Sequence, residues 1–315
     1  MKPEPTLSHS YSDPHPYPAG VAWQDGQYIP VSEAKISVLD YGFLHSDATY
    51  DTVHVWDGAF FRLDAHIERF LAGVERLRMT LPVSAGEIRE ILHGCVALSG
   101  HRRAYVEMIC TRGAAPYFSR DPRAAVNRFL AFAVPYGSVA SDEQMRRGLH
   151  VSVTDVTRIP PGSVDPRIKN YHWLDLIGGL FEAYDRGGET ALLLDGAGNI
   201  AEGPGFNVFS VRGGALLTPA AGVLRGITRR TVMEICHELG LHVDEGAVSP
   251  EALRGSDEVF ITSTAGGIMP VTRIDRHDVN DGEVGPITET IRRTYWQWHT
   301  DPRFIEEVSY PSPQA

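Results

Sequence analysis

The chain has 315 residues, of which 43% are hydrophobic and 22% charged, a composition that supports one large core or two moderate ones. Its net charge of −11 argues against general nucleic-acid binding, because phosphate contacts need a basic face. No apolar run approaches the about 20 residues of a membrane helix, and the start, MKPEPTLSHS, lacks the apolar core of a signal peptide. The three cysteines are odd in number and far apart, which is typical of buried thiols in a reduced, cytoplasmic protein.

The first half of the chain is predicted to form a small α+β domain over residues 19–136, after an extended arm at 1–18. Asp25-Gly26 and Asp57-Gly58 lie between apolar stretches and predict two hairpin turns. RAYVEMICTR and RFLAFAVPY predict further strands.

Two helices are expected between these strands. Asp64 is expected to cap the first, and Ser84 with Glu87 predicts a capping box for the second. Apolar residues recur at helical spacing in the first helix: Ile67, Phe70, Leu71, Val74 and Leu77.

Residues 137–148 are polar and without periodicity, and predict a linker to a larger domain over residues 149–315. That domain is expected to contain the helices 172–184 and 287–298 and a helix ended by Gly240. Its predicted strands and hairpins are HVSVTDV, ALLLDGAGNIAEG, FNVFSV, ALLTP and EVFITS. Strands and helices without regular βαβ alternation indicate two α+β domains rather than a Rossmann sheet.

Lys169 is a candidate nucleophile, because only three of the 29 basic residues are lysines and an arginine cannot offer a neutral amine. It follows a turn at Asp165-Pro166 and precedes an aromatic cluster; a surface lysine is the alternative. Glu202 lies in the glycine-rich segment GNIAEGPGF, where a carboxylate can pair with a protonated ring nitrogen or be an ordinary loop residue.

Two segments are candidate anion sites. Gly226, Ile227 and Thr228 begin a predicted helix, where free N–H groups suit a phosphate and a threonine N-cap is the alternative. Residues 263–267, STAGG, can form a nest of N–H groups after a strand. Arg69 borders the apolar stripe of the first helix, so it either extends to solvent or binds an anion. His45 and Tyr50, in the polar-aromatic run 39–52, either line a pocket or simply pack.

These pieces, in this order, resemble the fold-type IV pyridoxal-phosphate enzymes, and most closely the (R)-selective amine transaminases. The segments that carry the resemblance are HSDATYDTVHVWDGAFFRLDAHIERF, RIPPGSVDPRIKNYHWLDL, EGPGFNVF, GVLRGITRRTV and TAGGIMPVT. The resemblance implies a homodimeric aminotransferase with a small α/β N-terminal domain and a larger pseudo-barrel C-terminal domain.

The resemblance also implies the roles of individual residues. Lys169 would hold pyridoxal 5'-phosphate as an internal aldimine, a Schiff base, and move a proton between the substrate and the cofactor. Glu202 would keep the pyridinium nitrogen protonated, and Leu224 would pack on the ring. The phosphate would be bound by Arg69, Ile227, Thr228 and Thr264. The substrate would be bound by His45, Tyr50, Tyr105, Glu107, Trp173, Thr264 and Ala265. Asn207 receives no independent role.

One loop departs from the pattern of the (R)-amine transaminases. Those enzymes carry an arginine that neutralises the carboxylate of the amino acceptor, and Phe118 aligns with it here. Arg120, two residues later, would take that role if the loop shifts.

The expected reaction moves an amino group from an (R)-configured primary amine to a keto acid such as pyruvate. A D-amino acid or branched-chain amino acid aminotransferase is an alternative, and so is an aminodeoxychorismate lyase. A non-catalytic binding protein is a further alternative, which a cofactor bound covalently at Lys169 would exclude.

Overall fold

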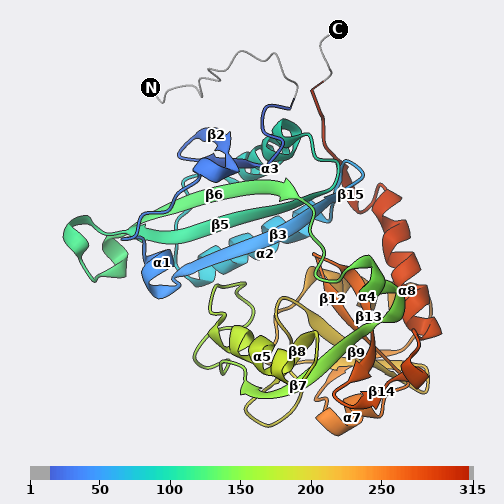
Figure 1. The fold of residues 1–315 in the computed structure, drawn as a ribbon. Coiled ribbons are helices and arrows are strands. Elements are labelled where there is room, and N and C mark those ends of the chain that lie inside the picture. The colour runs from blue at the N-terminus through green and yellow to red at the C-terminus, as the bar shows by residue number, and fades with distance from the viewer. Residues whose placement is uncertain (1–14, 312–315) are drawn as a thin grey trace. The chain divides into compact units, whose positions relative to one another are not determined.

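The computed structural model describes residues 15–311, so the first fourteen residues of the predicted arm lie outside the described part. The chain divides into two compact units (Figure 1). Unit 1 contains residues 15–137, Ile168–Tyr171 and the chain from Pro302 onward; unit 2 contains Ser138–Arg167 and His172–Asp301. The contiguous domain ranges read from the sequence remain a prediction, but unit 1 recruits the four residues around Lys169. A helix that crosses a membrane must be both long and apolar. Among the helices in the described part of the chain, none combines the length and the apolar character needed to cross a membrane.

Unit 1 is built on one antiparallel sheet in which long strands occupy the centre (Figure 1). The strand order is β15-β4-β3-β5-β6-β1-β2. Both predicted hairpins are confirmed, because Asp25-Gly26 joins β1 to β2 and Asp57-Gly58 joins β3 to β4. The strands are β1 Val21–Gln24, β2 Gln27–Pro30, β3 Ala48–Trp56, β4 Ala59–Phe61, β5 Ala104–Ala114, β6 Val126–Pro135 and β15 Ile305–Glu307.

Helices α2 (Leu63–Arg76) and α3 (Ala85–Ser99) pack on this sheet and share its core. The capping box of Ser84 and Glu87 is confirmed at the start of α3. The cap predicted at Asp64 is wrong: α2 begins one residue earlier, and Asp64 lies in its first turn. Arg62 is the N-cap, in a left-handed conformation that the pattern of apolar residues could not reveal.

A short helix, α1 (Tyr41–His45), was not predicted from the run 39–52. Asp40 is its N-cap and accepts a hydrogen bond of 2.7 Å from the N–H of Gly42. The C-cap of the helix is Ser46, which takes a left-handed conformation with φ of 55°. The run 39–52 therefore contains a helix cap, a short helix, a turn and the start of β3. Polar and aromatic residues are mixed in it because these elements follow one another so closely.

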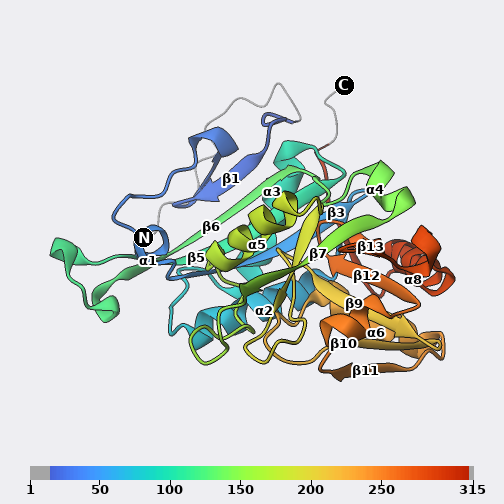
Figure 2. The ribbon, with the colours of Figure 1, turned by 60° about the horizontal axis from the view of Figure 1, so that its bottom comes forward.

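Unit 2 is built on a mixed sheet of order β11-β10-β9-β12-β13-β7-β8, with β14 paired to β13. Figure 2 shows β9, β10 and β11 next to α6. The ALLLDGAGNIAEG hairpin forms: its second arm is no regular strand, but it is joined to β8 and the turn by three backbone hydrogen bonds and by a bridge between Leu194 and Ile200. The strands are β7 Leu149–Thr157, β8 Thr190–Leu194, β9 Asn207–Arg212, β10 Ala215–Pro219, β11 Val243–Gly246, β12 Glu258–Ser263, β13 Gly267–Ile274 and β14 His277–Asp278.

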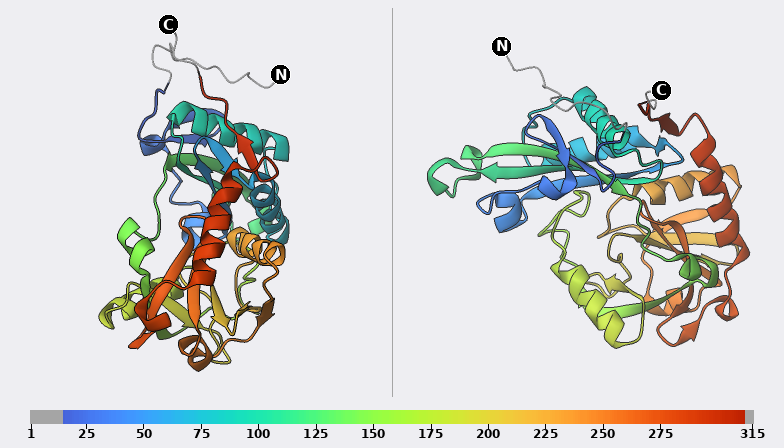
Figure 3. Two further views of the ribbon diagram at one scale, coloured as in Figure 1. Left: turned by 90° about the vertical axis from the view of Figure 1, so that its right-hand side faces the viewer. Right: turned by 45° about the horizontal axis from the view of Figure 1, so that its top comes forward.

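The helices of unit 2 are α4 Asp142–Arg147, α5 Leu174–Asp185, α6 Ile227–Glu238, α7 Pro250–Arg254 and α8 Pro286–Gln297. The segment 137–148, predicted to be a linker, contains α4, which starts at a capping box formed by Ser141 and Gln144; the linker role stays a prediction. Helix α8 packs against β12 and β13, as Figure 3 shows. The buried carboxylate of Glu258 fixes its start by accepting hydrogen bonds from the N–H groups of Ile287 and Thr288, at 3.0 and 2.7 Å.

Candidate active site

Lys169 lies beside the first half of β3, where a four-residue segment of the chain joins the sheet of unit 1. The carbonyl of Lys169 accepts hydrogen bonds from the N–H of Tyr50 at 3.1 Å and the hydroxyl of Thr49 at 2.9 Å. Its Nζ lies 4.2 Å from the centre of the Tyr50 ring. Tyr171, two residues on, stacks on Tyr50 with ring centres 4.3 Å apart. Lys169 is thus partly buried against aromatic rings, and its role as a nucleophile stays a prediction.

A cluster of hydroxyl groups surrounds the carboxylate of Glu107 in the same unit. Glu107 is opposite Thr52 in the ladder between β3 and β5, so both side chains project from one face. The carboxylate accepts hydrogen bonds from Tyr171 at 2.8 Å, Tyr105 at 3.0 Å and Thr52 at 3.4 Å. Burial raises the pKa of Glu107, although the Tyr171 hydroxyl and the charge of Lys169 oppose the shift.

Arg69 is held by a buried carboxylate that the sequence interpretation missed. Asp51 accepts hydrogen bonds from Nε and Nη2 of Arg69 at 2.7 and 2.9 Å, and a third contact joins it to Nδ1 of His66 at 2.8 Å. Burial alone would raise the pKa of Asp51, but the Arg69 guanidinium and His66 bring that pKa well below its usual range. Burial lowers the pKa of His66. The spacing of His66 and Arg69 on one face of α2 was the available signal.

In unit 2, Glu202 is fixed from both of its oxygens. Arg158 donates to Oε1 from Nε at 3.2 Å and Nη2 at 3.0 Å, while the N–H of Leu224 donates to Oε2 at 2.9 Å. Nη1 of Arg158 pairs in turn with Asp175. Glu202 is buried, so it is no ordinary loop glutamate, and the sequence interpretation found neither Arg158 nor Asp175.

The start of α6 brings together Gly226, Ile227 and Thr228, as predicted. Gly226 is the N-cap, no described side chain caps the helix, and the Thr228 side chain is buried. A Cβ on residue 226 would lie 2.3 Å from Oδ1 of Asn207, whose Nδ2 bonds the Leu224 carbonyl at 2.9 Å. Asn207 therefore shapes this turn. Free N–H groups at the first turn of a twelve-residue helix suit an anion.

The turn between β12 and β13 carries Thr264 and Ala265, which are partly exposed. The Ser263 hydroxyl accepts a hydrogen bond of 3.3 Å from the N–H of Ala265, and the Ala265 carbonyl accepts one of 2.7 Å from Val139. Trp173 precedes α5 and packs beside Gly205, where an added Cβ would be 3.5 Å from its ring. All of these residues belong to unit 2.

Two predicted substrate residues are exposed on unit 1. His45 ends α1, with its ring 4.9 Å from that of Tyr41. Arg120 follows a short 3₁₀ turn at Pro116–Phe118 and forms no ion pair or hydrogen bond with any residue in 15–311.

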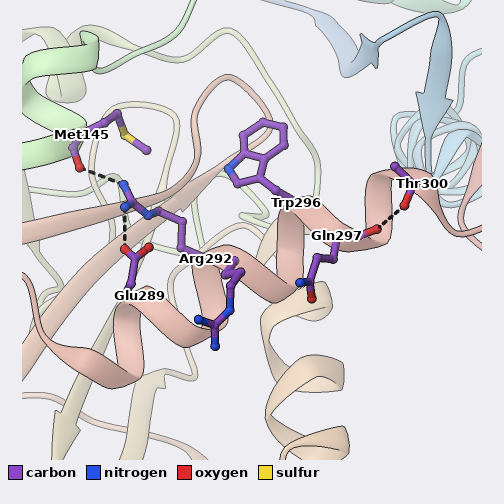
Figure 4. A pocket seen from close by; sticks show the side chains of 7 residues that line it. Met145, Glu289, Arg292, Trp296, Gln297 and Thr300 are labelled. Carbon is purple, nitrogen blue, oxygen red and sulfur yellow. Dashed lines mark hydrogen bonds and ion pairs between the residues drawn. The ribbon is translucent and has the colours of Figure 1, made fainter.

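A separate pocket of about 610 Å³ lies on α8 of unit 2 (Figure 4). Arg292 is engaged there by Glu289 and by the Met145 carbonyl. None of the residues predicted from the sequence lines this pocket, so we assign it no part in the site.

The described residues fit the chemistry of pyridoxal 5'-phosphate. Within unit 1, Lys169 is an amine of the kind that joins its aldehyde, and Arg69 is a cation of the kind that binds its phosphate. Within unit 2, Glu202 is a carboxylate suited to a protonated ring nitrogen, and the start of α6 is suited to a phosphate. Each of these groups is fixed by neighbours within its own unit.

Comparisons with known proteins agree with this chemistry. The family described as amino-transferase class IV matches residues 48–274. A putative branched-chain-amino-acid aminotransferase of Methanocaldococcus jannaschii is 30% identical over 274 residues, which cover 86% of this chain and 93% of the relative.

Two solved structures are similar over nearly the whole chain. The branched-chain amino acid aminotransferase of Thermobaculum terrenum in its PLP-form has a TM-score of 0.83 at 28% identity, covering 93% of this chain and 99% of the other. The branched-chain amino acid aminotransferase of Escherichia coli has a TM-score of 0.88 at 25% identity, covering 92% and 100%. The chain therefore belongs to the class IV aminotransferases, enzymes of fold type IV that depend on pyridoxal phosphate.

Proposed function

We propose that this aminotransferase transfers an amino group from an (R)-configured primary amine to a keto acid such as pyruvate. The observation that carries the proposal is the buried carboxylate of Glu107, which shares unit 1 with Lys169 and holds three hydroxyl groups around it. The hydroxyls of Tyr171 and Tyr105 and the charge of Lys169 favour the ionised form of Glu107 against its burial, and a donor carboxylate placed beside that anion would be repelled. An amine without a carboxylate meets no such barrier.

Lys169 is the catalytic residue in this proposal. Its Nζ would hold the cofactor, and once an incoming amine has freed it, the same lysine amine would serve as the general base and acid that moves a proton from the substrate carbon. Tyr50 and Tyr171 support it: one ring lies under Nζ, and the other stacks on the first. When bound, pyridoxal phosphate supplies an electron sink for the substrate carbon.

The remaining residues bind and orient. Glu202 would accept a hydrogen bond from the protonated ring nitrogen, and Leu224 would pack on the ring. The phosphate would be bound by Arg69, by the turn of Ile227 and Thr228, and by Thr264. His45, Tyr50, Tyr105, Trp173 and Ala265 contact the substrate.

Arg120 is proposed to bind the carboxylate of the keto acid. Its exposed guanidinium has no partner among residues 15–311, so no described ion pair must break for it to act. A guanidinium can bind a carboxylate through two parallel hydrogen bonds.

A branched-chain amino acid aminotransferase is the second candidate function. The similarity to relatives of that name favours it. It requires the site to accept an α-carboxylate on the donor as well as on the acceptor, and Glu107 argues against this.

The decisive experiment measures the first half of the reaction, without an amino acceptor, for five candidate donors. The purified enzyme, loaded with cofactor, is mixed separately with (R)-1-phenylethylamine, its (S)-enantiomer, D-alanine, L-leucine and aminodeoxychorismate. Conversion to the pyridoxamine form, followed by absorbance, is expected with the (R)-amine. A response to L-leucine without one to the (R)-amine would establish the second candidate instead. Release of pyruvate from aminodeoxychorismate without an acceptor would indicate a lyase.

We also propose a cytoplasmic homodimer with the domain ranges 19–136 and 149–315. Three buried free cysteines support a reducing compartment. Large apolar side chains are exposed along one side of α5, which supports association with a second copy: Leu174, Ile177, Phe181 and Tyr184. Gel filtration with light scattering measures the assembly, and a monomer at micromolar concentration would contradict it.

A further inference from the structure

Arg158 links two carboxylates in unit 2 that lie far apart in the sequence. It directly follows β7, and its N–H donates to the Leu194 carbonyl at 2.8 Å, which fixes the backbone from which the side chain projects. Two nitrogens of its guanidinium donate to Oε1 of Glu202 and a third pairs with Asp175. The guanidinium is therefore shared between the two carboxylates.

Asp175 is itself held in place at the start of α5. Its Oδ2 accepts a hydrogen bond of 2.9 Å from the N–H of Ile159, the residue after Arg158, and its Oδ1 accepts one of 2.8 Å from Leu176. The side chains of Asp175 and Glu202 are each 9% exposed and that of Arg158 is 12% exposed. Removing one partner would leave a buried charge unpaired, which is costly in the free energy of folding. The three groups therefore depend on one another.

The arrangement determines both the charge and the direction of Glu202. With all three groups ionised, the chain Asp175–Arg158–Glu202 carries one net negative charge. The positive charge of Arg158 stabilises the ionised form of the buried Glu202. Because Asp175 also pairs with Arg158, the attraction between Arg158 and Glu202 is weaker than it would be in an isolated pair. Bonds to both oxygens leave the carboxylate little freedom to turn.

We propose that Arg158 and Asp175 are positioning residues that set how strongly Glu202 holds a proton on the ring nitrogen of pyridoxal phosphate. The inference rests on the proposed role of Glu202. Arg158 keeps Glu202 an anion that accepts the ring N–H, and Asp175 prevents Arg158 from neutralising that anion. Together they keep the ring protonated, which strengthens its capacity to accept electrons from the substrate.

The test uses the variants Arg158→Met, Arg158→Lys, Asp175→Asn and Glu202→Gln, and the double variant Arg158→Met/Glu202→Gln, each loaded with cofactor. The first measurement is the rate of the half-reaction at saturating (R)-1-phenylethylamine. Glu202→Gln and Arg158→Met should each lower it about 10- to 100-fold, with the KM for the amine changed less than about threefold. The double variant should lose no more than Glu202→Gln alone, because Arg158 acts through Glu202.

The second measurement does not depend on turnover. The absorbance of the bound cofactor changes with pH, because a proton leaves the nitrogen that links the cofactor to Lys169. Loss of the positive ring nitrogen makes that proton harder to remove, so the midpoint should move to higher pH in Arg158→Met and Glu202→Gln alike. Asp175→Asn should move it in the same direction by less, and Arg158→Lys should restore part of the wild-type value. A purely structural role would lower thermal stability without moving this midpoint.

Arg186→Met is the matched control. Arg186 is also an arginine of unit 2 with two acidic partners, Asp155 and Glu182, but it does not contact Glu202. It should leave the rate and the midpoint unchanged.

The outcomes separate the two proposals. If Glu202→Gln changes neither rate nor midpoint, the proposed role of Glu202 fails. The positioning role fails if Glu202→Gln lowers the rate as expected but the double variant loses the product of the two single-variant losses. It also fails if the midpoint of Arg158→Met stays at the wild-type value. If Arg158→Met does not fold, Asp175→Asn decides, because an unchanged midpoint there overturns the inference.

Discussion

Asp51 and Arg69 form a doubly hydrogen-bonded ion pair inside unit 1, with N–O distances of 2.7 and 2.9 Å and an Asp51 side chain that is 0% exposed. Two residues from β3 and α2 thus fix the direction of a cation proposed to bind phosphate. Asp51 has two effects: it connects β3 to α2, and it holds the guanidinium of Arg69 in one orientation.

Replacing Asp51 with Asn should weaken cofactor binding and stability together. The amide cannot accept both hydrogen bonds, so the ion pair with Arg69 is lost at a fully buried side chain, at a cost of about 2–4 kcal/mol in the free energy of unfolding. The dissociation constant of the apoprotein for pyridoxal phosphate, measured by fluorescence quenching, should rise about tenfold or more.

Asp121→Asn is the control for this change. Asp121 also accepts a forked pair of hydrogen bonds, from Arg123, but at the protein surface. It should alter neither cofactor binding nor unfolding. An Asp51→Asn protein that binds the cofactor like wild type would contradict the orienting role.

His66 should make stability depend on pH below about 6.5, the ordinary pKa of histidine. Burial lowers the pKa of His66 in the folded protein, so acid protonates the unfolded chain first. The unfolded state then binds more protons, and the free energy of unfolding falls as pH falls through this window. His66→Asn keeps a donor towards Asp51 and removes the titration.

The measurement is the melting temperature between pH 7.5 and 5.5. The decrease on acidification should be smaller in His66→Asn than in wild type. His242→Asn, which changes an exposed histidine, should follow the wild-type curve. Parallel curves for wild type and His66→Asn would show that His66 does not titrate on unfolding.

Replacing Glu107 with Gln should shift the donor preference towards amino acids. The amide preserves the size of the side chain and removes the charge that opposes a donor carboxylate. The ratio of kcat/KM for L-leucine to that for (R)-1-phenylethylamine should rise about tenfold, or ~1.4 kcal/mol. Tyr105→Phe removes one hydroxyl of the cluster but keeps the charge, and should not raise the ratio. An unchanged ratio in Glu107→Gln would remove the main support for an amine donor.

Lys169→Arg should abolish turnover as completely as Lys169→Ala, although it keeps the positive charge. A guanidinium cannot provide the neutral amine that covalent attachment and proton transfer need. After borohydride reduction, mass spectrometry of the tryptic peptides should find the cofactor on Lys169 in wild type and on no peptide in either variant. Lys35→Ala, a matched change at a lysine of unit 1, should keep both activity and label. Turnover by Lys169→Arg would overturn the assignment.

The amino-acid sequence determined the local elements and the type of chemistry. Asp-Gly pairs specified two hairpins, a Ser-x-x-Glu pattern specified the start of α3, and apolar spacing identified α2 before its cap was known. The scarcity of lysine identified Lys169 as a candidate nucleophile, and ordered motifs indicated the family. The signals for hairpins and helices are readable because each depends on residues a few positions apart, whereas the other two are read from the composition and the order of motifs along the chain.

The tertiary structure alone decided which polar side chains pair with one another. Asp51 and Arg69 are eighteen residues apart, Arg158 and Glu202 forty-four, and Thr52 and Glu107 fifty-five. Nothing in the local pattern around an aspartate or an arginine specifies its partner, because strand register and helix packing bring the two together. The structure also placed Lys169 with unit 1, since the free edge at the start of β3 pairs with the chain around it. Sequence therefore indicated what the site contains, and folding determined what holds each group in place.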